Sequence, residues 1–287
     1  SKLPVLVFSL EMSKEQIMYR LLSMESNVSQ SRLRSGKLSK TDWTKLNKII
    51  KLLSKLPLFV DDSSDLAVQE IRTKIKTILF QYPTIGLVII DYLQLMQTPI
   101  SNNGNRAQEL SQITRALKNL AREFNIPIIA LSQLSRNIET RTDKRPILSD
   151  LRESGSIEQD ADLVLMLYQN ESNNPEPSSD NINKVIDLII AKQRNGPTGN
   201  LQLKFDKKRT KYFLLPPWEQ QKMTNHFLRN PDKRPGIFAD WNPIRKNPGT
   251  VVHIPQKVVG HLSRIRTYVR TYVRTYVRTY VRIRTYV

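Results

Sequence analysis

Short apolar runs alternate with helical periodicity along the first 217 residues of the chain. Each run has the length of a strand and is nearly continuously apolar, which is typical of strands buried on both faces of a parallel sheet. Alternation of such strands with amphipathic helices indicates βαβ units, so the pattern predicts an α/β fold with a mainly parallel sheet flanked by helices. The predicted strands are residues 4–9, 58–61, 87–91, 127–132 and 163–168.

Helices are predicted between these strands by a cap and by apolar residues that share one helical face. Ser13 is followed three residues later by Gln16, a capping-box pattern that predicts a helix over residues 14–24. Two further apolar faces predict two more helices. They are formed by Val68, Ile71, Ile75, Ile78 and Leu79, and by Ala107, Leu110, Ile113, Leu117, Leu120 and Phe124.

Regular patterning continues after Val185 through a strand and a C-terminal β-hairpin, and it ends near residue 215. The charge changes at the same place: residues 1–217 hold 31 basic and 23 acidic residues, and residues 218–287 hold 14 and 3. The tail therefore contributes more than half of the net charge of +19. With two prolines at the boundary, we predict a folded domain over residues 1–217 and a basic, poorly structured tail over residues 218–287.

The tail contains a short tandem repeat, because residues 266–281 are four identical copies of Arg-Thr-Tyr-Val. Arg and Tyr would share one side of an extended strand, with Thr and Val on the other. Two interpretations are open: a basic extension without a role of its own, and an arm that binds DNA.

Composition excludes several kinds of chemistry. The chain has no cysteine, and its three histidines, His226, His253 and His261, all lie in the tail. Disulfides, thiolate metal sites, zinc sites and histidine-based triads are therefore excluded from residues 1–217. No apolar run approaches the length of a membrane span and no signal-peptide pattern opens the chain, so we expect no membrane partner and no secretion. The chain starts with Ser1 and enters a predicted strand at once, so we expect that its N-terminus has been cut.

Polar residues follow three of the predicted strands, and they are the first candidates for chemistry. Asp91 ends an apolar strand, Glu11 follows another, and Gln133 follows a third. In nucleotide hydrolases one such acid holds magnesium and a second activates water, provided that their strands are neighbours. Each residue also has a simpler explanation: Asp91 as a turn or cap residue, Glu11 as a charge in the first turn of a helix, and Gln133 as an ordinary polar strand exit.

Two further segments could contact phosphate. Residues 149–160 are polar and contain Arg152, Glu153 and Gly155, which suits either contacts to a phosphate backbone or the start of a helix. Lys192 and Arg194 follow an apolar strand, where a guanidinium could stabilise a transferring phosphate or simply be solvated. Neither GxxxxGK[ST] nor GxGxxG occurs in the chain, so it lacks a phosphate-cradling loop of either kind.

Six short motifs, taken in order, resemble those of one known family. They are SLEM at residues 9–12, IIDYLQLM at 89–96, SQLSR at 132–136, DKRP at 143–146, DLRESGSIEQDADL at 150–163 and KQRNGP at 192–197. Their sequence and spacing resemble the C-terminal motor domain of the replicative DNA helicases of the DnaB family, over residues 2–215. The resemblance implies a RecA-like core of the P-loop NTPase type, which assembles as a homo-hexameric ring, hydrolyses ATP with Mg²⁺ and moves along single-stranded DNA.

The resemblance also implies roles for individual residues. Glu11 would activate the attacking water, Asp91 would hold Mg²⁺ through water, and Gln133 would sense the γ-phosphate. Lys192 and Arg194 would reach the ATP of the neighbouring subunit, as an arginine finger does. All five are therefore catalytic and cofactor-binding candidates.

The DNA contacts and the partners follow from the same resemblance. Arg152, Glu153 and Gly155 match a loop that grips the DNA backbone in the central channel. Primase and a helicase loader are the expected protein partners.

The chain departs from the family in two respects. The family's Walker A loop would lie just before residue 4, so we expect this chain alone to bind ATP poorly and to hydrolyse almost none. Nothing after residue 217 resembles the family. Two alternatives are open: another RecA-like DNA-dependent ATPase of repair or recombination, and a non-catalytic DNA-binding fragment. Abundant Lys, Asn, Ile and Ser indicate an AT-rich coding sequence, which suggests the plastid stroma or a bacterial cytoplasm.

Overall fold

A parallel four-stranded sheet forms the centre of the domain. The computed structural model describes residues 3–97, 106–169 and 183–215. The predicted tail, residues 218–287, lies outside them. The strand order is β2-β1-β3-β4, and all three neighbouring pairs are parallel. The strands are β1 (Val5–Ser9), β2 (Leu58–Asp61), β3 (Leu87–Asp91) and β4 (Ile128–Ala130).

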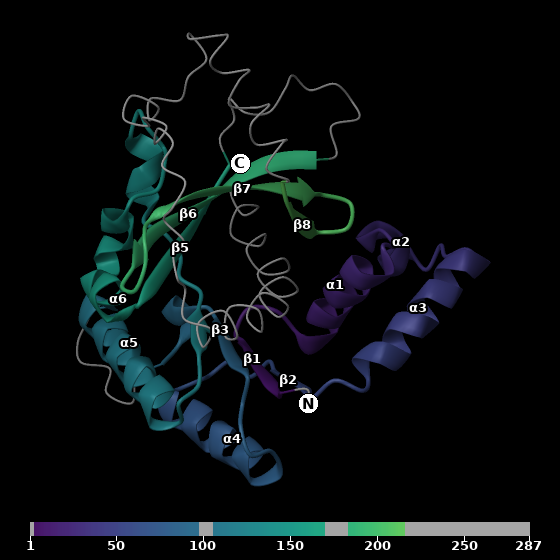
Figure 1. Ribbon diagram of the computed structural model, residues 1–287, viewed down its shortest axis with the longest axis horizontal. Helices are drawn as coiled ribbons and strands as arrows, with labels where there is room; N and C mark the ends of the chain where they lie inside the picture. Colours follow the sequence, from purple (N-terminus) through teal and green to yellow (C-terminus); the bar gives the residue numbers. More distant parts are fainter. Residues whose placement is uncertain (1–2, 98–105, 170–182, 216–287) are drawn as a thin grey trace, which may run out of the picture.

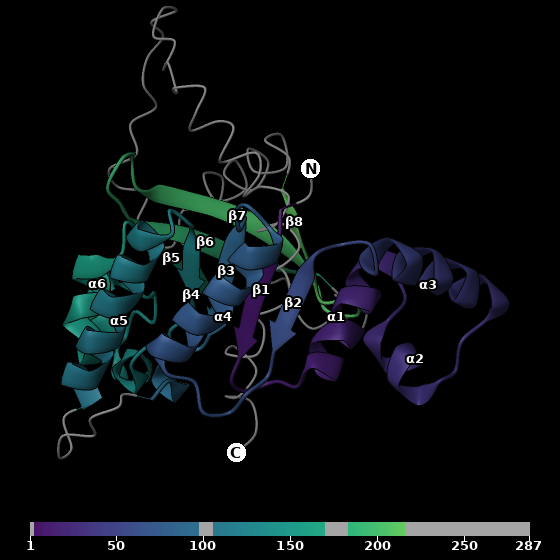
Figure 2. The same ribbon diagram turned by 90° about the horizontal axis from the view of Figure 1, so that it is seen from below.

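Helices cover both faces of this sheet, as Figure 2 shows. Alternate residues of β1 enter two separate cores: Leu6 and Phe8 pack with α4 and α5, and Val5 and Val7 pack with α1. The central strands β1 and β3 are buried along their whole length, whereas β2 and β4, at the edges, are only partly buried. The helices are α1 (Lys14–Ser26), α2 (Gln30–Ser35), α3 (Lys40–Leu53), α4 (Val68–Gln81) and α5 (Arg106–Glu123).

A second, antiparallel sheet follows, in the order β5-β6-β7-β8 (Figure 1). The prediction that residues 163–168 form a strand buried on both faces was wrong. Leu163 and Leu165 are 49% and 43% exposed, whereas Val164 and Met166 are buried. The reason is that this strand pairs antiparallel with β6 and packs on one face only. The strands are β5 (Leu163–Tyr168), β6 (Asn183–Gln193), β7 (Gly199–Asp206) and β8 (Lys211–Leu214), which confirms the predicted hairpin.

The antiparallel sheet is fastened to the carboxyl end of α1. That helix has no basic residue in its last turn. Instead, Lys211 donates from Nζ to the Met24 carbonyl at 3.1 Å, and Arg209 donates from Nε to the Asn27 carbonyl at 3.1 Å. Both cations therefore neutralise the negative end of the helix dipole from a distant part of the chain.

The helices α2 and α3 were not predicted, although α3 has a clear start signal. Ser39 Oγ accepts from the Asp42 N–H, and Asp42 Oδ2 accepts from the Ser39 N–H, which is a complete capping box. Four short elements complete the fold: η1 (Leu93–Leu95), η2 (Arg136–Thr140), η3 (Leu148–Ser154) and α6 (Gly155–Asp160). None of the helices within the described residues is long and apolar enough to cross a membrane.

Candidate functional site

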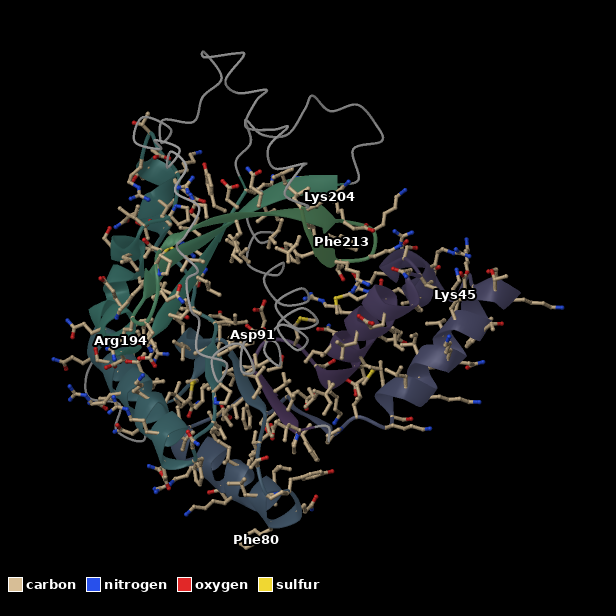
Figure 3. The ribbon with its side chains drawn as sticks, viewed as in Figure 1. Lys45, Phe80, Asp91, Arg194, Lys204 and Phe213 are labelled. Atoms are coloured by element: carbon tan, nitrogen blue, oxygen red, sulfur yellow. The ribbon has the colours of Figure 1, made fainter. Side chains whose placement is uncertain are left out.

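Asp91 is a fully buried carboxylate at the carboxyl end of β3 (Figure 3). Neither of its side-chain oxygens has a hydrogen-bond partner. Burial, with a smaller contribution from the charge of Glu11, raises the pKa of Asp91 from 3.8 to about 8, and Arg20 opposes this shift. A buried carboxylate with no donor around it requires a proton or a cation, because an isolated buried charge is very costly.

Glu11 lies beside Asp91 because β1 and β3 are neighbours in register, with Ser9 opposite Asp91. The Leu10 N–H donates to the Asp91 carbonyl at 2.8 Å, which ties the chain after β1 to the end of β3. Ser9 Oγ donates to the Met12 carbonyl at 2.7 Å and closes a tight turn around Glu11. The side chain of Glu11 is exposed. The sheet thus brings together an exposed acid and a buried one.

Gln133 follows β4, on the other side of β3, and its backbone is held by Gln94. The Gln133 N–H donates to Gln94 Oε1 at 3.2 Å, and Gln94 Nε2 donates to Ser132 Oγ at 2.9 Å. Arg106 in turn donates to the Gln94 carbonyl at 2.7 Å. The Gln133 side chain is exposed. The strand exit is therefore fixed while the amide of Gln133 can reach a ligand.

This group of residues fits a magnesium ion held partly by water and phosphate. Among the described residues there is no group of three or more His, Asp or Glu side chains that could bind a metal alone. Magnesium usually takes one or two protein carboxylates and keeps several waters. The unpaired oxygens of Asp91 meet that requirement, and a bound cation would displace the proton that burial favours.

Lys192 and Arg194 lie at the end of β6, and Figure 3 shows Arg194 apart from Asp91, on the side of α5 and α6. Lys192 Nζ donates to the Glu158 carbonyl, and Arg194 donates from Nη2 to the Gln159 carbonyl at 2.7 Å. Arg194 also forms an ion pair with Asp162 at 3.1 Å. Within one chain, therefore, the two cations cap the carboxyl end of α6 and do not contact Asp91.

The third group of predicted residues lies at the start of α6, before the end that Lys192 and Arg194 cap. Arg152 and Glu153 lie in η3, and Gly155 begins α6, so the segment is helical as the simpler explanation supposed. Their side chains lie outside the described part of the structure.

Two positioning residues were missed by sequence reasoning. Gln94 and Asp162 both lie inside the quoted motifs, but neither was given a role. Asp162 accepts hydrogen bonds from Lys118, on α5, and from Arg194. Lys118 contributes most to lowering the pKa of the Asp162 carboxyl, and the charge of Arg194 adds to it. Only the folded chain reveals these partners, because they are distant from one another in sequence.

A parallel sheet whose adjacent strand ends gather two acids and a glutamine defines a RecA-like α/β domain. The model of the DnaB-like helicase C terminal domain matches residues 1–213. The chain therefore belongs to the DnaB-like helicase family.

Relatives and solved structures agree with this assignment. The chain is 64% identical over 212 residues to a probable replicative DNA helicase of Trieres chinensis, covering 74% of this chain and 47% of that protein. It is 49% identical over 211 residues to the replicative DNA helicase DnaB of Geobacillus stearothermophilus, covering 74% and 46%. It thus spans about half the length of these curated relatives.

Two solved structures extend the comparison to the fold. A solved ATPase domain matches with a TM-score of 0.69 and 37% identity, covering 75% of both chains. The structure of a DnaB-like replicative helicase and its interactions with primase matches with a TM-score of 0.68 and 37% identity. That match covers 75% of this chain and 51% of the other.

Proposed function

We propose that this chain is the motor part of a replicative DNA helicase, which couples ATP hydrolysis to movement along single-stranded DNA and to unwinding of the duplex. One observation carries the proposal: the buried Asp91, with both oxygens unpaired, lies between the strand ends that present Glu11 and Gln133. Family membership supports the same activity.

The proposed chemistry divides the work between two acids in different environments. Asp91 would hold Mg²⁺ in its ionised form, and the ion would supply positive charge to the phosphate oxygens. Glu11, which is exposed, orients the attacking water and accepts its proton. Gln133 reports on the γ-phosphate, because its amide both donates and accepts hydrogen bonds.

Lys192 and Arg194 complete the site from a neighbouring subunit in the proposed homo-hexamer. Within one chain both side chains donate to carbonyls of α6, and Arg194 lies apart from Asp91 in Figure 3, which supports a role in trans. Both cations hold the carboxyl end of α6, which begins at Gly155. Arg152, Glu153 and Gly155 are the proposed contacts to the DNA backbone, so contact of Lys192 and Arg194 with a neighbouring ATP is coupled to the DNA contacts of their own subunit.

Primase and a helicase loader are the proposed protein partners. The solved relative described with primase supports the first. We propose the plastid stroma or a bacterial cytoplasm as the compartment, and the diatom relative Trieres chinensis favours the plastid.

The catalytic assignment is tested by joining the chain to the upstream half of the Geobacillus stearothermophilus relative, which supplies the rest of the protein. Glu11→Gln should abolish ATP hydrolysis stimulated by single-stranded DNA and leave binding of an ATP analogue unchanged. Glu15→Gln is the matched control, because Glu15 is an exposed acid in the first turn of α1, four residues after Glu11, and its replacement should not alter turnover. Full hydrolysis by the Glu11 variant would overturn the assignment.

The role in trans is tested by mixing subunits. Arg194→Ala rings should lose hydrolysis, by roughly 10³-fold or more if the guanidinium acts as an arginine finger. Rings mixed with Glu11→Gln subunits should regain part of it, because each variant supplies what the other lacks. No recovery at any mixing ratio would show that Arg194 does not act on a neighbouring site.

Two other functions remain to be separated from this one. A non-catalytic DNA-binding chain is favoured by the net charge of +19. It predicts that the chain does not bind ATP analogues and that its affinity for DNA does not change when nucleotide is added. Another RecA-like ATPase of repair or recombination predicts strand exchange in place of unwinding. Assays of unwinding and strand exchange on the same forked DNA distinguish the two enzymes.

A further inference from the structure

The positive charge of the folded domain is concentrated in the segment that contains α2 and α3. Residues 27–57 hold eight basic residues and a single acid, whereas the rest of residues 1–217 holds 23 basic and 22 acidic residues. The domain outside this segment is therefore almost neutral. We name residues 27–57 the basic arm; Figures 1 and 2 show that its helices project from the body, and they pack mainly on α1.

The one acid of the basic arm does not offset this charge at the surface. Asp42 is buried, and its carboxylate accepts the Ser39 N–H in the capping box. It also forms an ion pair with Arg32, whereas the charge of Lys45 is the smallest of the influences that lower its pKa. Because Asp42 serves the cap and Arg32, the other cations of the arm have no acid of their own within it.

Five lysines form an exposed stripe along α3 and the turn after it. At 100° per residue each lies 100° or more from the buried Leu46, and together they extend over about 22 Å at 1.5 Å per residue. No salt bridge of the described residues includes any of them. Lys45, labelled on the arm in Figure 3, is exposed. The stripe consists of Lys40, Lys45, Lys48, Lys51 and Lys55.

The spacing within the stripe costs stability unless an anion is bound. Lys45, Lys48 and Lys51 follow one another at intervals of three residues, and Lys55 follows after four, so each lysine faces a like charge on the next turn. Like charges at these intervals repel and weaken a helix. A polyanion lying along α3 would remove that repulsion.

We propose that the basic arm is a binding surface for the phosphate backbone of nucleic acid, separate from the ATP site and from the Arg152–Gly155 segment. A regular row of lysines recognises a repeating charge and no particular sequence, because ammonium groups contact phosphate as point charges. Trp43 is 52% exposed at the start of α3, where it can stack on an unpaired base.

Nucleic acid fits this surface better than a lipid membrane does. A helix that lies in a membrane surface needs one continuous apolar face. The exposed large apolar residues of α3 are Trp43, Ile50 and Leu52. Trp43 and Ile50 lie within about 60° of Leu46, on the face that packs against Val28 and Leu33, whereas Leu52 lies about 120° from Leu46, among the lysines. The apolar face of α3 is therefore partly covered by packing within the domain, and the lysine face carries only Leu52.

The test measures binding of the full 287-residue chain to a labelled DNA duplex of about 20 base pairs, without nucleotide, over a range of salt concentrations. The test variant is Lys45→Gln/Lys48→Gln/Lys51→Gln, whose helix propensity is nearly unchanged. The control is Lys76→Gln/Lys144→Gln/Lys208→Gln, which removes the same charge from three exposed lysines elsewhere. Residues 218–287 are present in both variants, so their own contribution to binding cancels.

In the arm variant the negative slope of log affinity against log salt should become shallower by about 2 to 3, as expected for three lost phosphate contacts. The control should leave the slope unchanged. Affinity at ~0.1 M salt should fall at least ~10-fold relative to the control. Lys45→Arg/Lys48→Arg/Lys51→Arg should restore both, which separates lost charge from lost folding. The same variants are also tested for binding to phosphatidylserine vesicles. Equal losses of DNA affinity in the arm variant and the control would overturn the proposal. So would an arm variant that loses binding to the vesicles but keeps its affinity for DNA. The result is independent of ATP hydrolysis, so Glu11→Gln should not alter it.

Discussion

Replacement of Asp91 by Asn tests whether this carboxylate is buried without a partner. Burial raises its pKa from 3.8 to about 8, so the folded chain keeps a proton that the unfolded chain releases. The stability of the native chain is therefore intact below about pH 4 and declines as the pH rises toward 8. Asn has nearly the same shape and never ionises, so Asp91→Asn should lack this decline.

The size of the effect follows from the shift. About four pH units at ~1.4 kcal/mol per unit set a ceiling of about 6 kcal/mol on the difference between the two chains at pH 8 and above. Relaxation and entry of water reduce such penalties, so we expect about 2–5 kcal/mol at about pH 8 and a difference near zero at about pH 4.

Urea unfolding of both chains at several pH values, without Mg²⁺, measures this difference. Glu70→Gln, on the surface of α4, is the control and should change the free energy of unfolding by less than ~0.5 kcal/mol at any pH. If Asp91→Asn is no more stable than the native chain near pH 8, or if the difference does not grow with pH, the carboxylate has a partner and the reasoning fails.

Three further predictions concern other parts of the fold. Asp162→Asn should lower the maximal rate of ATP hydrolysis by the completed ring and leave its KM for ATP unchanged, because Asp162 pairs with Arg194 and has no proposed contact with ATP. Steady-state kinetics measures both quantities, and an unchanged maximal rate would contradict the prediction. Ser39→Ala should lower the free energy of unfolding by about 0.5–2 kcal/mol in urea titration, since it removes the cap of α3. Phe80→Ser should leave the urea midpoint unchanged, because this ring is 91% exposed at the end of α4, and a marked loss of stability would reveal a contact of the ring.

The sequence predicted strands most accurately where both faces of the strand are buried. Strands β1 and β3 are apolar at nearly every position, and they are the central strands buried on both faces. The same rule failed for β5, because an apolar run does not reveal whether its neighbour is parallel or antiparallel, nor how many of its faces are covered. The helix α3 was missed although Ser39 and Asp42 mark its start and Trp43, Leu46, Ile50 and Leu53 follow at helical spacing.

The residue types of the candidate site were determined by the sequence alone. With neither cysteine nor histidine in residues 1–217, only acids, amides, hydroxyls and cations could serve, and the motifs already singled out Glu11, Asp91 and Gln133. The tertiary structure decided their environments. Neighbouring strands bring the three strand ends together, and burial leaves Asp91 without a donor, while the exposed Glu11 keeps access to water. It also decided that Lys192 and Arg194 lie against α6 and not beside Asp91. These differences arise from long-range packing, since a carboxylate's pKa depends on what surrounds it in space and not on its neighbours in sequence.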